Sequence, residues 1–140
     1  MSISTVGLQT LASDLASYLA ISEVADYGPN GIQVEGNPEI TKLVTGVSAC
    51  QELFVRAREA GADAVLVHHG IFWDGMPYPL TGLQYRRVRE LIDGEMSLLA
   101  YHLPLDRHLE VGNNAVAAQR LGLVEIQPFG LSKGVAIGVR

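Results

Sequence analysis

Three histidines and one aspartate follow two apolar segments of the chain. His68 and His69 come directly after the apolar run 64–67, whereas His102 ends a second such run and Asp106 lies four residues beyond it. Neutral imidazole and carboxylate groups suit Zn²⁺, Fe²⁺, Mn²⁺ or Co²⁺ better than Ca²⁺ or a metal that prefers thiolates. The repeated pattern therefore favours a site for a divalent metal, and the residue types leave the choice among these four metals open.

An ordinary structural role is the alternative for each histidine, because an imidazole near the end of a strand is often a hydrogen-bonded core residue. Neighbouring residues in a strand point to opposite faces. His68 and His69 can therefore serve one site only if the backbone leaves extended geometry between them, which Gly70 makes easy. The segment 103–105 contains a proline and favours an extended or turned link, so the curvature of this loop decides whether the side chains on either side of it converge.

Several other residues have both a functional and a structural explanation. His108 lies in a polar stretch and is expected at the surface, outside the metal set. Three arginines within residues 86–89 could meet an anionic substrate, but a solvated helix face is the commoner case. Trp73 could line a pocket or only pack its loop, and the amides of Asn30 and Gln33 suit an ordinary turn.

Hydrophobic periodicity and capping signals predict the elements that must position these residues. The predicted helices cover residues 5–20, 48–61, 81–94 and 113–121, and the predicted strands cover residues 32–35, 42–47, 63–67, 95–101 and 135–139. Ser48 with Gln51, and Thr81 with Gln84, match the capping box that begins a helix. The last strand is still running at Arg140, which suggests that the sequence is a fragment; a terminal edge strand is the alternative.

The alternation of strands and helices with short connections predicts right-handed crossovers, and therefore a largely parallel sheet flanked by helices. The expected fold class is α/β, and 140 residues suffice for a single domain over residues 1–140. Parallel strands share one carboxyl edge, and open α/β sheets bind their ligands just past that edge. The two histidine-bearing segments should therefore meet there.

Composition excludes several classes of function. With 10 basic and 15 acidic residues and a net charge of −5, the chain has no electrostatic footprint for duplex nucleic acid. One cysteine rules out an internal disulfide and fits a reducing compartment. There is no basic leader, and no stretch approaches the ~20 apolar residues that cross a bilayer, so we expect a soluble cytoplasmic protein with no membrane partner. Gly-rich phosphate loops, nucleophile elbows and paired cysteines are also missing, which leaves metal-activated water as the simplest chemistry.

Three segments of the chain carry a resemblance to a known family. They are residues 26–36, residues 61–70 with the His-His-Gly ending, and residues 102–106 with the His-x-x-x-Asp pattern, followed by Gly-Asn-Asn at 112–114. Their order and spacing run through nearly the whole chain. On these motifs the chain resembles the Nif-three-like proteins, often named GTP cyclohydrolase I type 2 homologues.

The resemblance implies a Nif-three-like α/β fold, assembly into toroidal homohexamers and a dinuclear metal centre that faces the inner cavity. It also implies that His68, His69 and Asp106 are metal ligands, and that His102 lies in or beside the centre as a ligand or a proton-transfer group, which makes it the candidate catalytic residue. Family members are longer, and a histidine and a glutamate of a C-terminal helix complete their site. Residues 1–140 would then be the N-terminal, metal-binding half of a longer family domain.

The function implied by the resemblance is that of a metal-dependent hydrolase, in which two metal ions activate water and a nucleotide such as GTP is the substrate. No residue of this chain by itself selects guanine or a triphosphate. The alternative is a metal-binding regulatory or interaction protein whose ring assembly, without turnover, is its function. A phosphoesterase or amidohydrolase that acts on another small molecule is a third interpretation with the same metal dependence.

Overall fold

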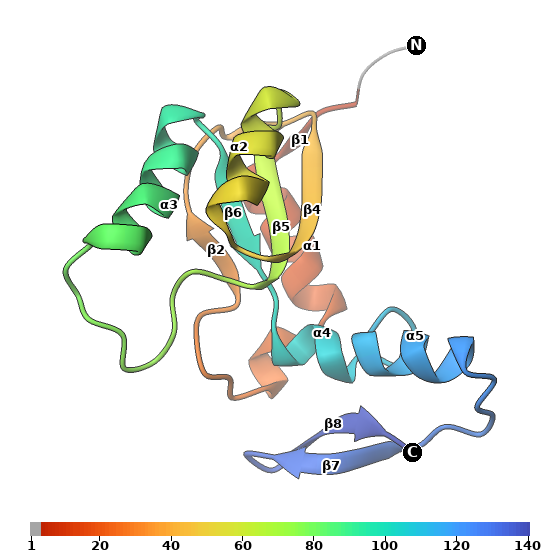
Figure 1. Cartoon of the computed structure of the whole chain (residues 1–140). Coiled ribbons are helices and arrows are strands. Elements are labelled where there is room, and N and C mark those ends of the chain that lie inside the picture. Colours follow the sequence, from red (N-terminus) through yellow and green to blue (C-terminus); the bar gives the residue numbers. More distant parts are fainter. Residues whose placement is uncertain (1–3) are drawn as a thin grey trace.

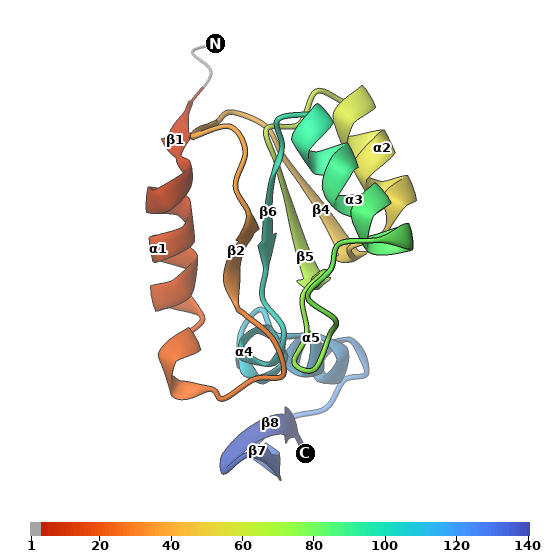
Figure 2. The same ribbon diagram turned by 90° about the vertical axis from the view of Figure 1, so that its left-hand side faces the viewer.

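The molecule has three layers, with a central sheet between helices. A computed structural model describes residues 4–140. Figure 2 shows α1 (Leu8–Tyr18) along one face of the sheet, and α2 (Gln51–Glu59) and α3 (Gly82–Asp93) along the other. This arrangement confirms the expected α/β class.

The remaining elements follow a simple order along the chain (Figure 1). They are β1 (Val6–Gly7), a 3₁₀ turn (Ile21–Glu23), β2 (Gly31–Val34), β3 (Glu39–Ile40), β4 (Leu43–Ser48), β5 (Ala64–His69), β6 (Ser97–Ala100), α4 (Leu103–Arg107), α5 (Asn113–Arg120), β7 (Pro128–Ser132) and β8 (Val135–Val139). Among the described residues, no helix is long and apolar enough to span a membrane.

The central sheet has the strand order β2-β6-β5-β4. The strands β4, β5 and β6 are parallel, whereas β2 pairs with β6 in the antiparallel sense. The sheet is therefore largely parallel, as predicted, and the short strand predicted at 32–35 is its antiparallel edge. Two further pairs, β1 with β3 and β7 with β8, are antiparallel and lie outside this sheet.

Strand β6 is buried on both faces, which explains its unbroken apolar sequence. Leu98 and Leu99 are both fully buried, but they belong to different core clusters. Leu98 packs in the cluster that contains Phe54 of α2, and Leu99 packs in the cluster that contains Leu8 of α1. One strand thus holds both helical layers to the sheet.

Neither of the two predicted capping boxes forms, and only one of them marks the start of its helix correctly. Helix α2 begins at Gln51 with Cys50 at its N-cap, and no side chain caps it. Ser48 instead remains in β4, and its hydroxyl is hydrogen-bonded to the Nδ1 atom of His69 at 3.0 Å. Thr81 does occupy the N-cap of α3, although its side chain makes no capping bond. The Ser48 hydroxyl, which the local sequence pattern predicted to cap the helix, therefore bonds to His69 on the neighbouring strand β5 instead.

The link between the two candidate residues after β6 is the turned one of the two predicted alternatives. Residues 103–107 form the one-turn helix α4, and Pro104 lies in its first turn. A proline is tolerated there because the backbone N–H that it lacks has no partner within the helix. Helix α1 is shorter than the helix predicted over residues 5–20, because Val6 and Gly7 pair with β3 before the helix begins.

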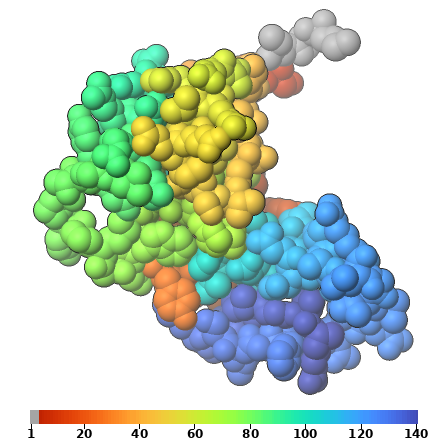
Figure 3. Space-filling view, viewed as in Figure 1, coloured from red at the N-terminus to blue at the C-terminus, as the bar shows by residue number. Residues whose placement is uncertain are grey.

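The C-terminal hairpin packs below the carboxyl edge of the sheet. Strand β8 confirms the strand predicted at 135–139, and it pairs with β7, which the sequence did not reveal. Lys133 and Gly134 connect the two strands and both have positive φ, the geometry of tight primed hairpin turns. Figure 3 shows this hairpin against the segment that contains Tyr27, whose hydroxyl is 3.4 Å from that of Ser132.

Candidate metal centre

Three histidines meet where β5 and β6 end. His68 and His69 are the last residues of β5, and His102 is the N-cap of α4, directly after β6 and Tyr101. One ligand atom of each histidine lies within 4.8 Å of those of the other two. The ring centroids of His68 and His69 are 4.4 Å apart, so neighbouring residues of one strand do reach the same site.

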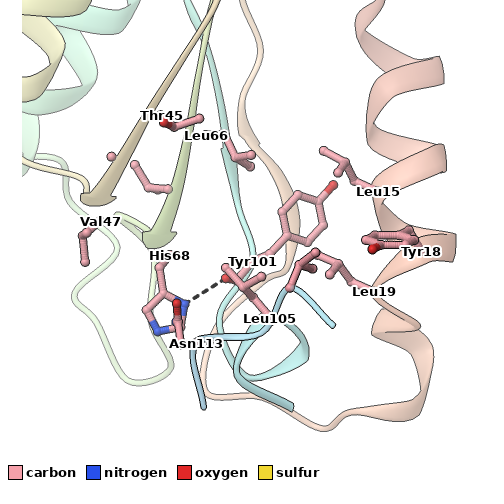
Figure 4. A pocket seen from close by; sticks show the side chains of 13 residues that line it. Leu15, Tyr18, Leu19, Thr45, Val47, Leu66, His68, Tyr101, Leu105 and Asn113 are labelled. Atoms are coloured by element: carbon pink, nitrogen blue, oxygen red, sulfur yellow. Dashed lines mark hydrogen bonds between the residues drawn. The ribbon is translucent and has the colours of Figure 1, made fainter. Parts of the chain in front are cut away.

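Each of the three imidazoles makes a hydrogen bond through Nδ1. The partner is the Tyr101 carbonyl for His68 (3.1 Å, dashed in Figure 4), the Ser48 hydroxyl for His69 (3.0 Å) and the Asp26 carboxylate for His102 (2.8 Å). A carbonyl and a carboxylate can only accept, so the Nδ1 atoms of His68 and His102 carry the proton. Their Nε2 atoms keep the lone pair that a metal ligand needs.

Asp106 lies beside the three histidines rather than among them. Its Oδ1 atom is 3.5 Å from the Nε2 atom of His68, and it also accepts a hydrogen bond from the Asn113 side chain at 2.9 Å. The turn of α4 carries Asp106 back toward β5. The fold thus brings together all four residues that the sequence singled out, with His68 in contact with the carboxylate.

Asp26 is the site residue that sequence reasoning did not assign. Its carboxylate is almost completely buried, and one oxygen accepts from the Nδ1 atom of His102. The same oxygen accepts from the Tyr27 N–H, and the other accepts from the Asn30 amide and the Leu103 N–H. In the sequence Asp26 is one more polar residue of the turn segment 26–31, because its burial and its main partner, 76 residues away, are visible only in the structure.

The hydrogen bonds of Asp26 decide its charge. Burial by itself raises the pKa of this carboxyl, but the bonds from Asn30, His102, Tyr27 and Leu103 together outweigh burial and leave the pKa below its ordinary value. The group is therefore a carboxylate at neutral pH, with every hydrogen bond pointing into it.

His69 has the opposite tendency. Partial desolvation by its surroundings, followed by the adjacent imidazoles of His68 and His102, lowers the pKa of His69, although this residue is exposed, while Asp106 acts against this. Metal ligation requires a neutral imidazole. The cluster therefore favours the protonation state that binds a cation, and the donor set of three imidazoles and one carboxylate fits a divalent ion of the zinc, iron, manganese or cobalt type.

The loop after β5 forms one wall of the site. Trp73 packs edge-on against the His102 ring with centroids 4.9 Å apart, and its indole N–H donates to the Gly70 carbonyl at 3.2 Å. The Gln33 amide oxygen accepts from the Ile71 N–H at 2.7 Å, and its amide nitrogen donates to a carbonyl in the turn before β2. Trp73 and Gln33 therefore hold the loop and do not contact the cluster through polar atoms.

An apolar groove of about 320 Å³ runs from His68 toward α1. Figure 4 shows Leu15 and Tyr18 of α1 on the right of the groove and the ends of β4 and β5 on its left. Tyr101 lies at its base, where burial raises the pKa of the phenol to about 12 and the hydroxyl donates to the Ala12 carbonyl. The groove offers a mostly apolar surface next to the candidate metal centre.

Two residues that the sequence left outside the site, His108 and Arg89, also lie outside it in the structure. His108 packs against Tyr18 with ring centroids 4.6 Å apart, and its Nδ1 atom accepts from two backbone N–H groups in the turn after α4. Arg89 pairs with Asp93 on the exposed side of α3. These contacts match the structural explanation for both.

Comparison with known proteins gives the family. A sequence model of Duf34/NIF3 (NGG1p interacting factor 3) matches residues 6–139. The chain belongs to the DUF34/NIF3 family. Its resemblance to Nif-three-like proteins is therefore confirmed over nearly the whole sequence.

Curated DUF34/NIF3 relatives are longer than this chain. The GTP cyclohydrolase 1 type 2 homolog of Pseudomonas aeruginosa is 50% identical over 117 residues, which cover 84% of this chain and 46% of the relative. The protein of the same name from Deinococcus radiodurans is 43% identical over 134 residues, which cover 96% and 51%. The chain thus spans about half the length of these relatives.

Solved structures confirm the expected fold. The structure of TTHA1606 from Thermus thermophilus superposes with a TM-score of 0.85 at 42% identity and covers 94% of this chain and 53% of that one. A protein described as ybgI, of unknown function, superposes with a TM-score of 0.83 at 42% identity and covers 89% and 49%. The α/β architecture is shared with both.

Proposed function

We propose that this chain binds divalent metal through His68, His69 and Asp106, and that the metal site catalyses hydrolysis. The observation that carries the proposal is the orientation of the imidazoles. With Nδ1 hydrogen-bonded in all three histidines, Nε2 is the nitrogen left for a ligand. Structural roles in the core would not require three histidines to place ring nitrogens within 4.8 Å of one another beside a carboxylate, whereas a metal site does require it.

The roles of the residues follow from their contacts. A bound divalent ion would supply a Lewis acid that activates water and polarises the bond under attack. His102 holds a proton at Nδ1 against Asp26, so its Nε2 atom can coordinate or accept a proton from water. Trp73 packs against the His102 ring and forms one wall of the site.

A nucleotide is our proposed substrate, since relatives carry the name GTP cyclohydrolase 1 type 2 homolog. The apolar groove beside His68 offers a surface on which a planar base can pack, and none of its lining residues within the described part of the chain is a lysine or arginine. We expect the base, rather than the triphosphate, to enter it. Two ions per chain and hexamer assembly are proposals based on the family resemblance, and a cytoplasmic location is a proposal based on the composition of the chain.

The test combines metal content with turnover. The chain is loaded separately with Zn²⁺, Fe²⁺, Mn²⁺ or Co²⁺ and incubated with GTP and a panel of nucleotides, and products are separated by chromatography. We expect the double variant His68→Ala/Asp106→Ala to lose both metal and product. His108→Ala is the matched control, because it removes a histidine outside the cluster and should retain both.

Two outcomes contradict different parts of the proposal. If product from the loaded wild-type chain does not exceed that from the double variant, the hydrolase assignment fails, and retained metal would then support a binding protein without turnover. If elemental analysis finds as much metal in the double variant as in the wild type, the assigned ligands are wrong.

A further inference from the structure

The Asp26 carboxylate is saturated by donors. Its Oδ1 atom accepts from the Tyr27 N–H at 2.7 Å and from the Nδ1 atom of His102 at 2.8 Å. Its Oδ2 atom accepts from the Asn30 amide at 2.9 Å and from the Leu103 N–H at 2.8 Å. Two of these partners belong to the segment that follows β6, so the acid joins the turn before β2 to the start of α4.

We propose that Asp26 is a positioning residue that fixes the tautomer of His102, with the proton on Nδ1 and the Nε2 lone pair directed at the site of His68 and His69. The inference rests on the proposed metal centre but not on hydrolysis. Its physical basis is that a carboxylate can only accept hydrogen bonds, so the ring nitrogen that faces it must donate. A carboxylate in this position also raises the basicity of the opposite nitrogen.

The four donors explain why an acid, and not its amide, is required here. In Asp26→Asn, the new NH₂ group faces two donors whichever way the amide is turned. Tyr27 and Leu103 present backbone N–H groups, which cannot become acceptors. Asn30 is fixed as well, because its own oxygen accepts from the His102 backbone N–H at 2.8 Å.

The His102 ring is therefore the one partner that can change from donor to acceptor. It would do so by moving its proton to Nε2, which removes the lone pair that a metal ligand or a base requires. The amide variant should thus switch the His102 tautomer and not merely loosen the loop.

A purely structural role is the competing explanation, and Asp63 offers a matched control for it. The Asp63 carboxylate accepts from two backbone N–H groups, those of Thr41 and Lys42, and from the side-chain amide of Asn37. It therefore resembles Asp26 in every partner except the imidazole. Asp63→Asn should cost stability in a similar way without affecting His102.

The experiment records long-range ¹H–¹⁵N spectra of the imidazoles in the metal-free wild type, Asp26→Asn and Asp63→Asn, with His102 assigned from His102→Gln. Affinity for Zn²⁺ is measured in the same three proteins by competition with a chelator. We expect the Nδ1–H tautomer in the wild type and in Asp63→Asn. In Asp26→Asn we expect the Nε2–H tautomer, and a Zn²⁺ affinity lower by about 10- to 100-fold because His102 then no longer serves as an additional ligand.

Several results would overturn the inference. One is a wild-type spectrum with the His102 proton mainly on Nε2. This result would contradict the inference even if the amide variant does not fold. Another is an unchanged tautomer in Asp26→Asn, and a third is an equal loss of Zn²⁺ affinity in Asp26→Asn and Asp63→Asn. Because none of these readouts involves turnover, failure of the hydrolase proposal leaves the test intact.

Discussion

At the scale of single residues, the candidate site depends on partners that orient each imidazole. The hydroxyl of Ser48, the carbonyl of Tyr101 and the carboxylate of Asp26 each hold one Nδ1 atom, and they come from three different segments. Such partners decide which nitrogen faces a metal and so tune affinity as much as the ligands do. The histidines could be predicted from strand-end spacing, whereas their partners lie 21 to 76 residues away and could not.

Gly70 should be sensitive to the addition of a single methyl group. A Cβ atom at this position would overlap the amide group of Gln33. The amide would have to move away, and its hydrogen bond from the Ile71 N–H would be lost. A buried donor left without a partner costs about 1–3 kcal/mol. We expect Gly70→Ala to lower the free energy of unfolding in urea by that amount.

Gly7→Ala is the control for this substitution. Its new methyl would meet only the Thr10 hydroxyl at 3.6 Å, an ordinary contact. A loss of stability in Gly70→Ala no greater than in Gly7→Ala would show that the Gln33 contacts are not needed to hold the loop.

At the scale of elements, the short helix α4 joins the metal centre to the C-terminal hairpin. Pro104 permits the helical turn that carries Asp106 toward His68. The Asn114 side chain of α5 then donates to the carbonyls of Asp106 and of Ile137 in β8, at 3.1 and 2.9 Å. An isolated two-stranded hairpin is only marginally stable in water, so these contacts, together with the bond from Lys133 to the Asp26 carbonyl, stabilise β7 and β8 against the rest of the molecule.

Asn114→Ala should make local opening of the hairpin β7–β8 easier without changing the stability of the central sheet. Loss of the one hydrogen bond to the hairpin, worth about 1 kcal/mol, predicts amide hydrogen exchange in β7 and β8 that is about fivefold faster. Exchange in β5 and β6 should stay unchanged. The measurement is hydrogen exchange followed by mass spectrometry on peptides from both regions.

Asn113→Ala provides the comparison, because that side chain donates to the Asp106 carboxylate and to no hairpin group. Equal acceleration of hairpin exchange in the two variants would contradict a specific role for Asn114.

At the scale of the whole molecule, one sheet carries two separate core clusters. Leu98 faces the cluster shared with α2 and α3, and Leu99 faces the cluster shared with α1. Because both residues lie on the same strand, which is buried on both faces, neither helical layer can detach without exposing β6. The carboxyl edge that holds the histidines is therefore supported from both sides.

Truncation of either leucine should destabilise the fold by a similar amount. Both side chains are fully buried, and a Leu→Ala change in a core costs about 2–5 kcal/mol. We expect Leu98→Ala and Leu99→Ala each to show this loss in a single urea transition, followed by circular dichroism. Val47→Ala, at a position 69% exposed on β4, should change stability by less than about 0.5 kcal/mol.

Two separate transitions in either leucine variant would show that the layers unfold independently. This outcome would contradict the view that β6 couples them.

The sequence by itself determined the parallel strands, the helices between them and the three histidines at the strand ends. Hydrophobic periodicity and turn residues are local signals, and burial on both faces of β5 and β6 follows directly from them. The tertiary structure decided which polar group each imidazole would meet. Asp26 reaches His102 because the turn before β2 crosses the end of β6, and Ser48 bonds His69 because β4 and β5 are in register there. These pairings depend on how segments that are distant in the sequence pack together, and no periodic pattern in the sequence predicts such packing.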